Sequence, residues 1–521
     1  MSAEIVKQKH DGSDIPGRIK HRRQFFFGPE GHNEFADWNK IAINDRDYLA
    51  VHPDLELSQS GNQDRSIILI GYLLDPDNPR ASNAEIVEGM VRGCDTFEKI
   101  IEKTNDYGGR WILIANIGPD SIMFNDAAGL RQIYYASSVQ AGKTWCASEP
   151  GQIAEKLKLS MDDEAFEFMK FREFEDNYDS FKVYWWPGNT SLYKEIKHLL
   201  PNHYLDIRTG LPHRFWPKAD LENVSMRDAL SISSELFRGL VDCAYRRYEL
   251  ALSLTSGWDS RLMLAASKEI VHDLYCYTLE YPGLKENKMD VVIPSKLLKK
   301  FSLTHHLISY PELIDEEFKC IFRINNPSVN KAYCADVQAL YDNIPKNRVC
   351  ITGDVAEIVK CQYRISGRNS NNISAHDLAK FAKMGTHPFA IKAFEEWLSM
   401  LDAKSIHVLD MFSWEQFVGR LQAQNQSECD IVFDTFAPYN CRKLLSTILS
   451  LEEKYRKPPL HMFHRKVIKN LWKDTLSEPI NPPENMNIKY VLQNILTKFH
   501  LYQIIPESAM LIAKRVIKRI S

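Results

Sequence analysis

Residues 254–261 decide the fold, and they read Leu254-Thr255-Ser256-Gly257-Trp258-Asp259-Ser260-Arg261. The stretch lies where an apolar strand ends and a helix begins. Small residues at 255–257 allow a tight turn with free backbone N–H groups, which suit a pyrophosphate at a helix N-terminus. Thr255 and Ser260 add hydroxyl donors, and Asp259 is placed to hold Mg²⁺, which prefers carboxylate and phosphate oxygens. The alternative is an ordinary strand–turn–helix junction with a capping aspartate.

Strands and helices alternate around this stretch. Short apolar runs predict strands over residues 250–254, 274–280, 305–309 and 349–352. Helical patterns cover residues 226–248, 259–268, 289–300 (interrupted near Pro294) and 332–342, and the chain is mostly helical from about 376 onward. This alternation predicts a parallel sheet with helices on both faces, with sites at the carboxyl ends of its strands.

The preceding part of the chain, from Arg65 to about Trp216, is β-rich. Apolar runs bounded by Gly, Asp or Pro predict strands over residues 66–73, 111–117, 133–137 and 203–207. Residues 83–92 and 96–103 have helical patterns. The mixture predicts sheets with helices packed on them.

Bulk composition excludes several classes of protein. At ~100–200 residues per domain, 521 residues predict two or three domains. The formal charge of -3 gives no indication of nucleic-acid binding. No apolar run approaches the ~18 residues of a membrane span, and the polar first residues lack a signal core, so we expect a cytoplasmic protein. The ten cysteines have no metal-binding spacing and are expected to be reduced thiols in or near the core.

A second acidic segment follows the predicted strand at 349–352. It reads Thr352-Gly353-Asp354-Val355-Ala356-Glu357. Taken alone, its two acids could be a charge pair at a helix N-terminus.

Both segments resemble motifs of one family. The first is similar to the PP-loop S-G-G-x-D-S of asparagine synthetases, β-lactam synthetases and related N-type ATP pyrophosphatases, with Ser256 in place of the first Gly. The second is similar to the family's S-G-E-G-A-D-E loop. Asp354 stands there at the first acidic position and Glu357 at the metal-binding one, while Val355 replaces the second Gly. The family's G-G-Y ending becomes Cys361-Gln362-Tyr363, which marks a diverged member.

Further matches follow in collinear order. Phe436-Ala437-Pro438-Tyr439 resembles the family's V-P-F segment. His464-Arg465-Lys466-Val467-Ile468-Lys469 resembles its K-x-x-L-R helix, with Arg465 at the phosphate-stabilising lysine and Lys466 beside it. A basic, solvated helix face is the alternative for these cations.

The N-terminal half resembles the family's glutaminase domain. Its matching segments are Gly109-Arg110-Trp111, the run from Asp126 to Tyr135, Ala147-Ser148-Glu149, and the run from Leu199 to Leu205. The glutaminase nucleophile, a Cys directly after the initiator Met, is absent. Ser2 follows Met1, and the first cysteine is Cys94. We therefore expect an inactive glutaminase whose fold is kept for packing or for shaping the acceptor site.

The resemblance implies an α/β protein of two domains. Residues 1–220 would form a degenerate, Ntn-type αββα sandwich-like domain. Residues 221–521 would form an adenine nucleotide α-hydrolase-like domain, the PP-loop domain, with a parallel sheet and helices on both faces.

The resemblance also implies ATP and Mg²⁺ as cofactors. The residues expected to bind the nucleotide are Leu254, Thr255, Ser256, Gly257, Asp259, Ser260, Thr278, Thr352 and Gly353. Asp259 and Glu357 would hold Mg²⁺. A substrate carboxylate would attack the α-phosphorus and expel pyrophosphate while Arg465 or Lys466 neutralises charge. An amine would then attack the acyl-adenylate and release AMP, with Asp354 as acceptor of its proton.

The acceptor and the nitrogen source stay open. The carboxylate could belong to a small molecule, a saccharide or a peptide, and the amine to free ammonia, a partner amidotransferase or a substrate. TSGWDSR resembles asparagine-synthase-like proteins of bacterial surface polysaccharide synthesis. The alternatives are an intramolecular lactam or macrolactam cyclase and a catalytically silent nucleotide-binding scaffold. No nucleic-acid partner is expected, and a homodimer is left open. The basic residues 511–520 leave open weak contact with a membrane surface, beside an ordinary docking helix.

Overall fold

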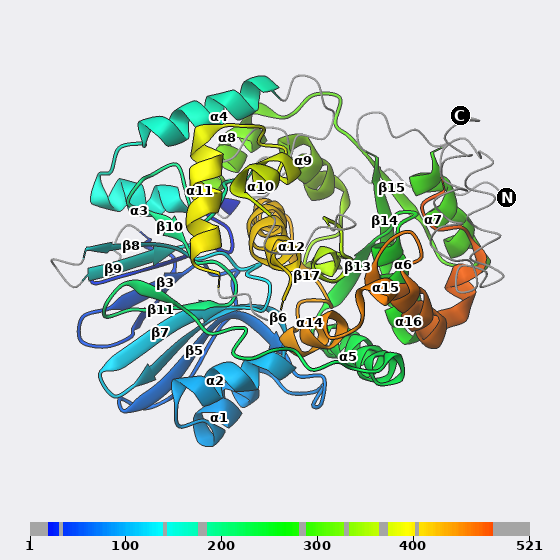
Figure 1. The fold of residues 1–521 in the computed structure, drawn as a ribbon, viewed down its shortest axis with the longest axis horizontal. Helices are drawn as coiled ribbons and strands as arrows, with labels where there is room; N and C mark the ends of the chain where they lie inside the picture. The colour runs from blue at the N-terminus through cyan, green and yellow to red at the C-terminus, as the bar shows by residue number, and fades with distance from the viewer. Residues whose placement is uncertain are drawn as a thin grey trace.

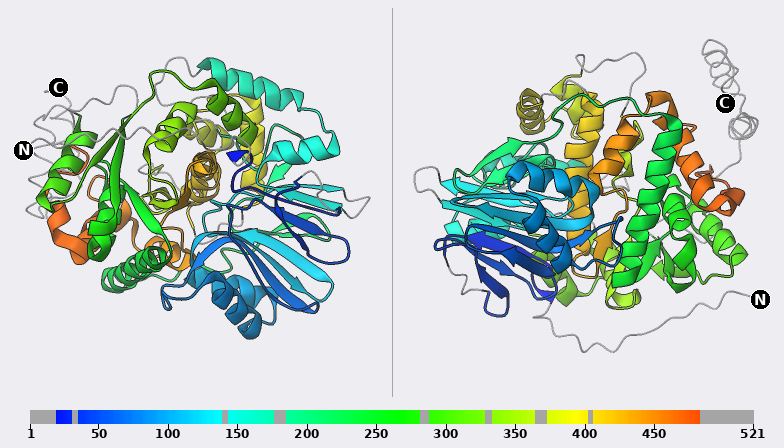
Figure 2. Two further views of the ribbon diagram at one scale, coloured as in Figure 1. Left: turned by 180° about the vertical axis from the view of Figure 1, so that it is seen from behind. Right: turned by 90° about the horizontal axis from the view of Figure 1, so that it is seen from below.

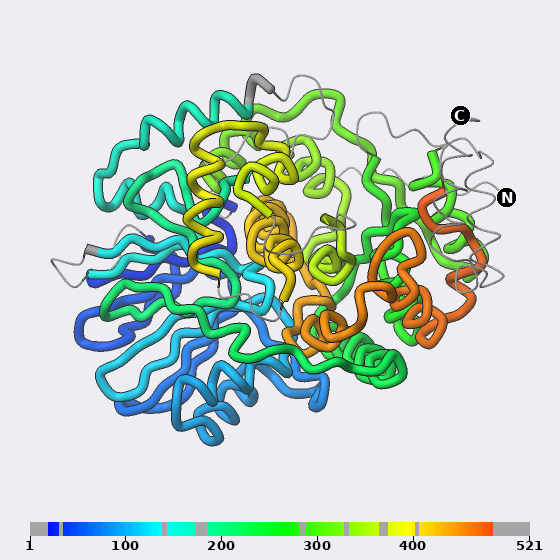
Figure 3. Tube along the Cα trace, viewed as in Figure 1, coloured from blue at the N-terminus to red at the C-terminus, as the bar shows by residue number. Residues whose placement is uncertain are grey.

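The chain folds into a β-rich N-terminal half and a C-terminal half in which helices surround a parallel sheet (Figure 1). A computed structural model describes residues 19–30, 35–138, 143–175, 185–280, 288–327, 333–363, 373–401 and 406–482. Figure 3 traces the chain from the β-rich half, in blue and cyan, into the other half, in green to red. The predictions for Met1, Ser2 and residues 511–520 concern residues outside these ranges. None of the helices described in these ranges is long and apolar enough to cross a membrane.

Two antiparallel sheets form the β-rich half. The first has the strand order β10-β8-β9-β1-β3-β2. Its strands are β1 (Phe25–Gly28), β2 (Asn39–Ala42), β3 (Tyr48–Val51), β8 (Tyr134–Ser138), β9 (Lys143–Ala147) and β10 (Lys197–His198). The second has the order β12-β11-β7-β6-β5-β4. Its strands are β4 (Leu57–Gly61), β5 (Arg65–Leu74), β6 (Gly108–Ile117), β7 (Asp120–Asn125), β11 (His203–Asp206) and β12 (Leu211–Arg214).

These sheets stack face to face, and helices cover their outer faces. Alternate residues of β1, such as Phe25 and Phe27, pack against Ile112 and Ile114 of β6 to form the core between the sheets. The opposite face of the second sheet packs on α1 (Asn83–Gly93) and α2 (Phe97–Lys103). The opposite face of the first packs on α3 (Pro150–Leu157), which is followed by α4 (Asp163–Glu175). Figure 1 shows the layers helix, sheet, sheet and helix from bottom to top at its left.

The sequence located four strands of this half and missed the other eight that the structure describes. β5, β6, β8 and β11 and both predicted helices are present, within a few residues of the predicted bounds. The β-rich region begins at Phe25 rather than at Arg65. The missed strands β1 to β4 are only four or five residues long, too short for their alternation to stand out.

A five-stranded parallel sheet forms the centre of the C-terminal half. Its strands run in the order β15-β14-β13-β16-β17. They are β13 (Glu249–Ser253), β14 (Tyr275–Glu280), β15 (His306–Ser309), β16 (Arg348–Ile351) and β17 (Asp434–Phe436). The sequence predicts a parallel sheet here and four of its strands, and misses the three-residue β17. Leu250 and Leu252 pack into one helical layer, and Ala251 packs into another on the opposite face. Both faces of the sheet are therefore buried, which is usual for parallel sheets.

Helices cover this sheet and fill the space between the two halves (Figures 1 and 2). They are α5 (Met226–Arg247), α6 (Trp258–Ala266), α7 (Met289–Lys300), α8 (Glu316–Asn325), α9 (Cys334–Asn343), α10 (Ala375–Phe381), α11 (Pro388–Ser399), α12 (Val408–Phe412), α13 (Ala423–Cys429), α14 (Arg442–Leu449), α15 (Glu453–Arg456) and α16 (Met462–Trp472). A π-helix over Ser413–Gln422 (η8) joins α12 to α13 without a break.

The expected interruption at Pro294 is wrong. α7 runs continuously through this buried proline. A proline within a helix removes one hydrogen bond at a cost of ~3 kcal/mol. Burial of the apolar face of α7, which includes Val291, Ile293 and Leu298, offsets that cost.

A buried ion cluster joins the two halves. Arg110 of β6 donates to Asp430 at 2.5 Å and to Asp434 at 3.0 Å, and Arg131 donates to Asp434 at 2.6 Å. Burial raises the pKa of Asp430. For Asp434 the two arginines outweigh burial and lower its pKa to about 2. Because these charges lie away from water, each depends on its partners to remain ionised.

We expect Arg110→Met to lower the free energy of unfolding by about 3–5 kcal/mol, because it leaves buried carboxylates without a cation. The matched control is Lys443→Met. Lys443 of α14 pairs with Asp106 at 3.0 Å and also joins the two halves, but that pair is exposed, so its loss should cost no more than ~1 kcal/mol. Urea unfolding monitored by tryptophan fluorescence measures both. Equal effects of the two variants would contradict a dominant role for the buried cluster.

Candidate functional site

The candidate site lies where the strand order of the parallel sheet reverses. β14 and β15 are added on one side of β13, and β16 and β17 on the other. Loops after adjacent strands therefore diverge between β13 and β16, and ligands of such sheets bind at this switch point. Gly353 brings the two loops together, because a Cβ at this position would lie 2.6 Å from the Cβ of Asp259. No larger residue fits there without separating the loops.

A cavity of about 320 Å³ opens at this point. The predicted site residues in its wall are Thr255, Asp259, Ser260, Thr352, Gly353, Asp354 and Glu357. The sequence did not anticipate the rest of its lining, which includes Tyr277, Cys350, Asn425, Gln426, Cys429 and Phe433. The cavity thus has an acidic end between the two loops and a largely uncharged end between the sheet and α13.

One lysine joins the two carboxylates expected to bind metal. Lys360 Nζ donates to Asp259 Oδ2 at 2.6 Å and to Glu357 Oε1 at 3.0 Å. Residues three apart eclipse one another on a 3₁₀ turn, and the turn Ala356–Val359 places Lys360 over Glu357. Burial by itself lowers the pKa of Lys360, but the two carboxylates outweigh it and raise the pKa above its ordinary value. Lys360 belongs to no motif used in the sequence analysis.

The acids of the second loop are held by glutamines. Gln422 Nε2 donates to Glu357 Oε2 at 2.8 Å, and the backbone N–H of Val355 donates to Gln422 Oε1 at 2.8 Å. Gln426 Nε2 donates to Asp354 Oδ2 at 2.9 Å. Both glutamines lie where η8 continues into α13, and π-helices are frequent at functional sites. Burial raises the pKa of Asp354.

The donor set fits a magnesium ion bound together with phosphate. Asp259 and Glu357 offer hard oxygen donors on converging loops. Asp259 Oδ1 is buried and has no hydrogen-bond partner in the described part of the chain. The described residues contain no group of three or more His, Cys, Asp or Glu that could hold a metal by themselves. Mg²⁺ commonly binds through one or two carboxylates plus substrate phosphates, so the protein would supply only part of the coordination.

The backbone of the first loop is engaged by side chains of the protein itself. Asp290 Oδ1, at the start of α7, accepts the backbone N–H of Ser256 at 2.9 Å and its hydroxyl at 2.6 Å. Thr255 Oγ1 accepts the N–H of Gly257 at 3.2 Å. Neither Ser256 nor Gly257 lines the cavity. The Asp290 carboxylate thus accepts the hydrogen bond of the Ser256 N–H group, which the sequence predicts to bind pyrophosphate.

The remaining predicted nucleotide residues lie behind the cavity. Leu254 is buried in the core, and its carbonyl accepts the hydroxyl of Thr278 at 2.7 Å. The same hydroxyl is 2.9 Å from His305 Nε2. Thr278 therefore holds β14 to the end of β13, and neither residue lines the cavity.

The predicted catalytic cations also lie outside the cavity lining. The Arg465 guanidinium stacks over the indole of Trp258, 5.6 Å from the ring centroid. Lys466 is exposed on α16. α16 turns His464 and Val467 into the core, so Arg465 points sideways and Lys466 outward. The Trp258 ring packs against His461, with the ring centroids 5.6 Å apart, and Trp258 does not line the cavity.

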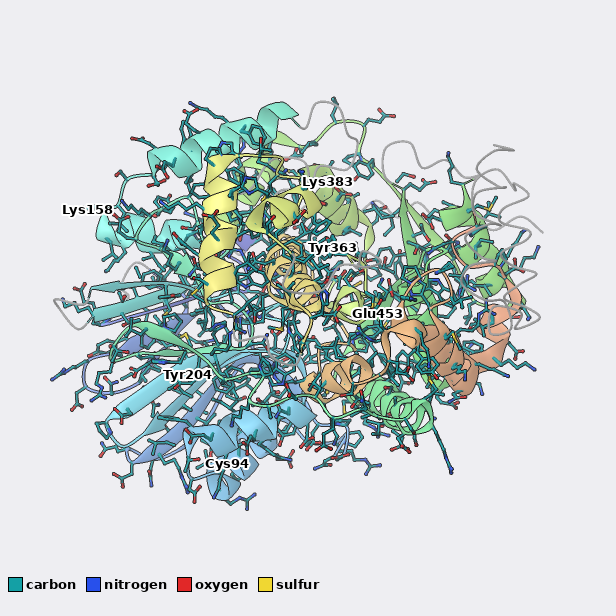
Figure 4. The ribbon with its side chains drawn as sticks, viewed as in Figure 1. Cys94, Lys158, Tyr204, Tyr363, Lys383 and Glu453 are labelled. Carbon is teal, nitrogen blue, oxygen red and sulfur yellow. The ribbon has the colours of Figure 1, made fainter. Side chains whose placement is uncertain are left out.

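The cysteines give no sign of a displaced glutaminase nucleophile. All ten are free, and Cys94 is buried at the end of α1. Burial raises the pKa of its thiol. Figure 4 shows Cys94 at the outer edge of the β-rich half and Tyr363 among the helices of the other half. Arg110 and Arg131 of the glutaminase-like motifs contact Asp430 and Asp434.

Comparisons with known proteins leave the family open. Neither a protein-family model nor a curated protein sequence matches the chain. One similar solved structure is described as the allosteric regulatory enzyme of purine biosynthesis. The two share 10% identity and a TM-score of 0.24, over 46% of this chain and 55% of that one. Another is the glutamine phosphoribosylpyrophosphate amidotransferase of B. subtilis complexed with ADP and GMP. It shows 9% identity and a TM-score of 0.22, over 66% of this chain and 72% of that one. The chain thus spans about half the length of the first, and neither similarity carries an argument at these scores.

Val355 is strained at the position where the resembled family has Gly. Its φ of 76° is left-handed, and its side chain is fully buried. Ala would keep the left-handed strain of ~1–2 kcal/mol, whereas Gly would release it.

We expect Val355→Gly to be more stable than Val355→Ala by about 1 kcal/mol in urea unfolding. The control pair is Val359→Gly and Val359→Ala on the adjacent 3₁₀ turn, where the order should reverse. The same order at both positions would argue against strain.

Glu428 of α13, like Lys360, is a largely buried ionisable residue that the sequence motifs did not identify. It is buried, and burial raises its pKa to about 8. In the unfolded chain the Glu428 carboxyl has its ordinary pKa of 4.5, so it loses its proton at a lower pH than in the folded chain. The free energy of unfolding therefore falls as the pH rises from about 4.5 to about 8.

We expect Glu428→Gln to gain stability relative to the wild type by ~1.4 kcal/mol for each pH unit across that window. Urea unfolding at about pH 5, 7 and 9 measures the difference, with exposed Glu395→Gln as control. A constant difference between Glu428→Gln and wild type at all three values would contradict a buried, protonated carboxyl.

Proposed function

We propose that this protein is an ATP-dependent amide-forming ligase of the asparagine synthetase type. It activates a substrate carboxylate as an acyl-adenylate and transfers the acyl group to an amine or to ammonia. One observation carries the proposal: Asp259 and Glu357, almost a hundred residues apart, share a cation beside one cavity at the switch point of the sheet. Convergence of an acid from each of the two resembled loops is what Mg·ATP chemistry requires.

The domain assignment is part of the proposal. Residues 1–220 are a degenerate Ntn-type domain, and residues 221–521 an adenine nucleotide α-hydrolase-like domain. The helix–sheet–sheet–helix layers and the parallel sheet support it. In this proposal the N-terminal domain has a structural role without glutaminase activity, which the pairing of Arg110 with Asp430 across the two halves supports.

The first step forms a bond between a carboxylate oxygen of the substrate and the α-phosphorus of ATP, and pyrophosphate leaves. Mg²⁺ would neutralise charge on the leaving pyrophosphate, held by Asp259 and Glu357. The protein contributes position and charge more than covalent chemistry. Gln422 fixes the Glu357 carboxylate, and the contact of Gly353 with Asp259 fixes the spacing of the loops.

The second step forms the amide bond. The amine nitrogen attacks the acyl carbon, the bond to AMP breaks, and the amine loses a proton. Asp354 lines the cavity, and burial raises its pKa, which makes it a better proton acceptor than an exposed carboxylate. Gln426 orients it. The uncharged end of the cavity is the acceptor side. Its substrate is a small-molecule, saccharide or peptide carboxylate, and surface polysaccharide modification is one setting.

A nucleotide-binding scaffold without activity is the second candidate. It is favoured by the positions of Arg465 and Lys466, which leave the cavity lining without either predicted cation. Detection of AMP or pyrophosphate separates it from the ligase.

We expect carboxylate-dependent exchange of labelled pyrophosphate into ATP by the wild type. Asp259→Asn and Glu357→Gln should each reduce it by at least about a hundredfold, because the charge on pyrophosphate is no longer balanced. The control is Asp242→Asn on the exposed face of α5, which should retain full exchange. Substrates come from a metabolite extract, with products scored by mass spectrometry. If no mixture yields AMP or pyrophosphate from the wild type, the scaffold is the better description.

A further inference from the structure

Lys360 occupies the position between the two carboxylates that a divalent cation needs. It has distances of 2.6 and 3.0 Å to one oxygen of each acid, and its side chain is 15% exposed. Of the four oxygens of Asp259 and Glu357, Lys360 engages two and Gln422 a third. Only Asp259 Oδ1 is left without a partner in the described part of the chain.

Because of this arrangement, the Lys360 ammonium group and a metal ion compete for the same carboxylate oxygens of Asp259 and Glu357. A metal ion that bridges the two acids must displace Lys360 from both of these carboxylates. An ammonium removed from both carboxylates and left unpaired in a largely buried position is costly. Displacement becomes favourable when a new anion enters beside the site, and a nucleotide triphosphate supplies one.

The loop after β13 presents the complementary arrangement. Asp290 holds the Ser256 N–H and hydroxyl, so a carboxylate of the protein takes the place of an anionic ligand there. Both halves of the site, the one for the cation and the one for the anion, are thus satisfied by charges of the chain itself. A cation and an anion that arrive together can exchange with both.

We propose that Lys360 is an internal counter-ion that keeps divalent metal out of the nucleotide-free site and couples metal binding to nucleotide binding. The coupling to nucleotide rests on the proposed function, whereas exclusion of free metal does not. By linkage, the nucleotide and the metal then raise each other's affinity by the same factor.

The probe is Mn²⁺, with free ion measured by electron paramagnetic resonance and without turnover. Wild type should bind Mn²⁺ only when a non-hydrolysable ATP analogue is present. Lys360→Met should bind Mn²⁺ without the analogue at least about tenfold more tightly than wild type, because two carboxylates are freed. Lys360→Arg keeps the charge and should resemble wild type. Lys319→Met, which removes a half-buried lysine of α8 that pairs with Glu316, is the matched control.

Two further measurements keep the test decisive. Lys360→Met with Asp259→Asn should lose the gained Mn²⁺ site, which locates the ion. Lys360→Met should melt below wild type without divalent ion and recover when Mn²⁺ is added. If Lys360→Met does not fold, the wild type decides the test. The proposal is overturned if the wild type binds Mn²⁺ tightly without the analogue and Asp259→Asn abolishes that binding. It is supported if the wild type binds Mn²⁺ only with the analogue.

The outcomes separate this inference from the ligase. Gain of Mn²⁺ binding by Lys360→Met supports metal exclusion even if the wild type never exchanges pyrophosphate into ATP. Equal Mn²⁺ affinity of wild type and Lys360→Met overturns metal exclusion even if pyrophosphate exchange is robust.

Discussion

The contact between the loop after β13 and the loop after β16 constrains everything else at the site. The two strands are neighbours, and their following loops part in opposite directions, so a gap opens at the carboxyl edge of the sheet. Gly353 lets the two loops approach so closely that an added Cβ would lie 2.6 Å from the Cβ of Asp259. Through this contact, acids from two loops come within reach of a single ammonium group. The cavity, the glutamines of the adjoining helix and the strained Val355 are all arranged around it.

The helix from η8 into α13 connects this edge with the β-rich half. At its carboxyl end Gln422 and Gln426 hold the acidic loop. Toward its start, Trp414 donates to the carbonyl of Ala127 at 2.8 Å. Just after α13, Asp430 pairs with Arg110. One continuous helix therefore contacts both the interface and the site, which ties the geometry of the site to the N-terminal half.

The carboxylates of the site are neutralised or hydrogen-bonded by other side chains of the protein. Buried carboxylates are tolerated only with cations or hydrogen bonds nearby, and the chain supplies Lys360, Gln422 and Gln426 for that purpose. Under the proposed function, the same groups would set the electrostatic conditions that an incoming metal–nucleotide complex meets. A ligand must offer both signs of charge to replace what the protein already provides.

Local pattern was enough to predict most of the alternation of strands and helices in the C-terminal half, four strands of the N-terminal half and the two acidic loops. Hydrophobic periodicity and glycine position are properties of neighbouring residues, so a sequence displays them directly. Side-chain direction was decided only by tertiary packing. Arg465 and Lys466 lie in a motif, yet the burial of α16 turns them from the cavity, whereas Lys360 has no motif and reaches both acids. Which charges meet depends on distances between segments about a hundred residues apart, and those distances exist only in the folded chain.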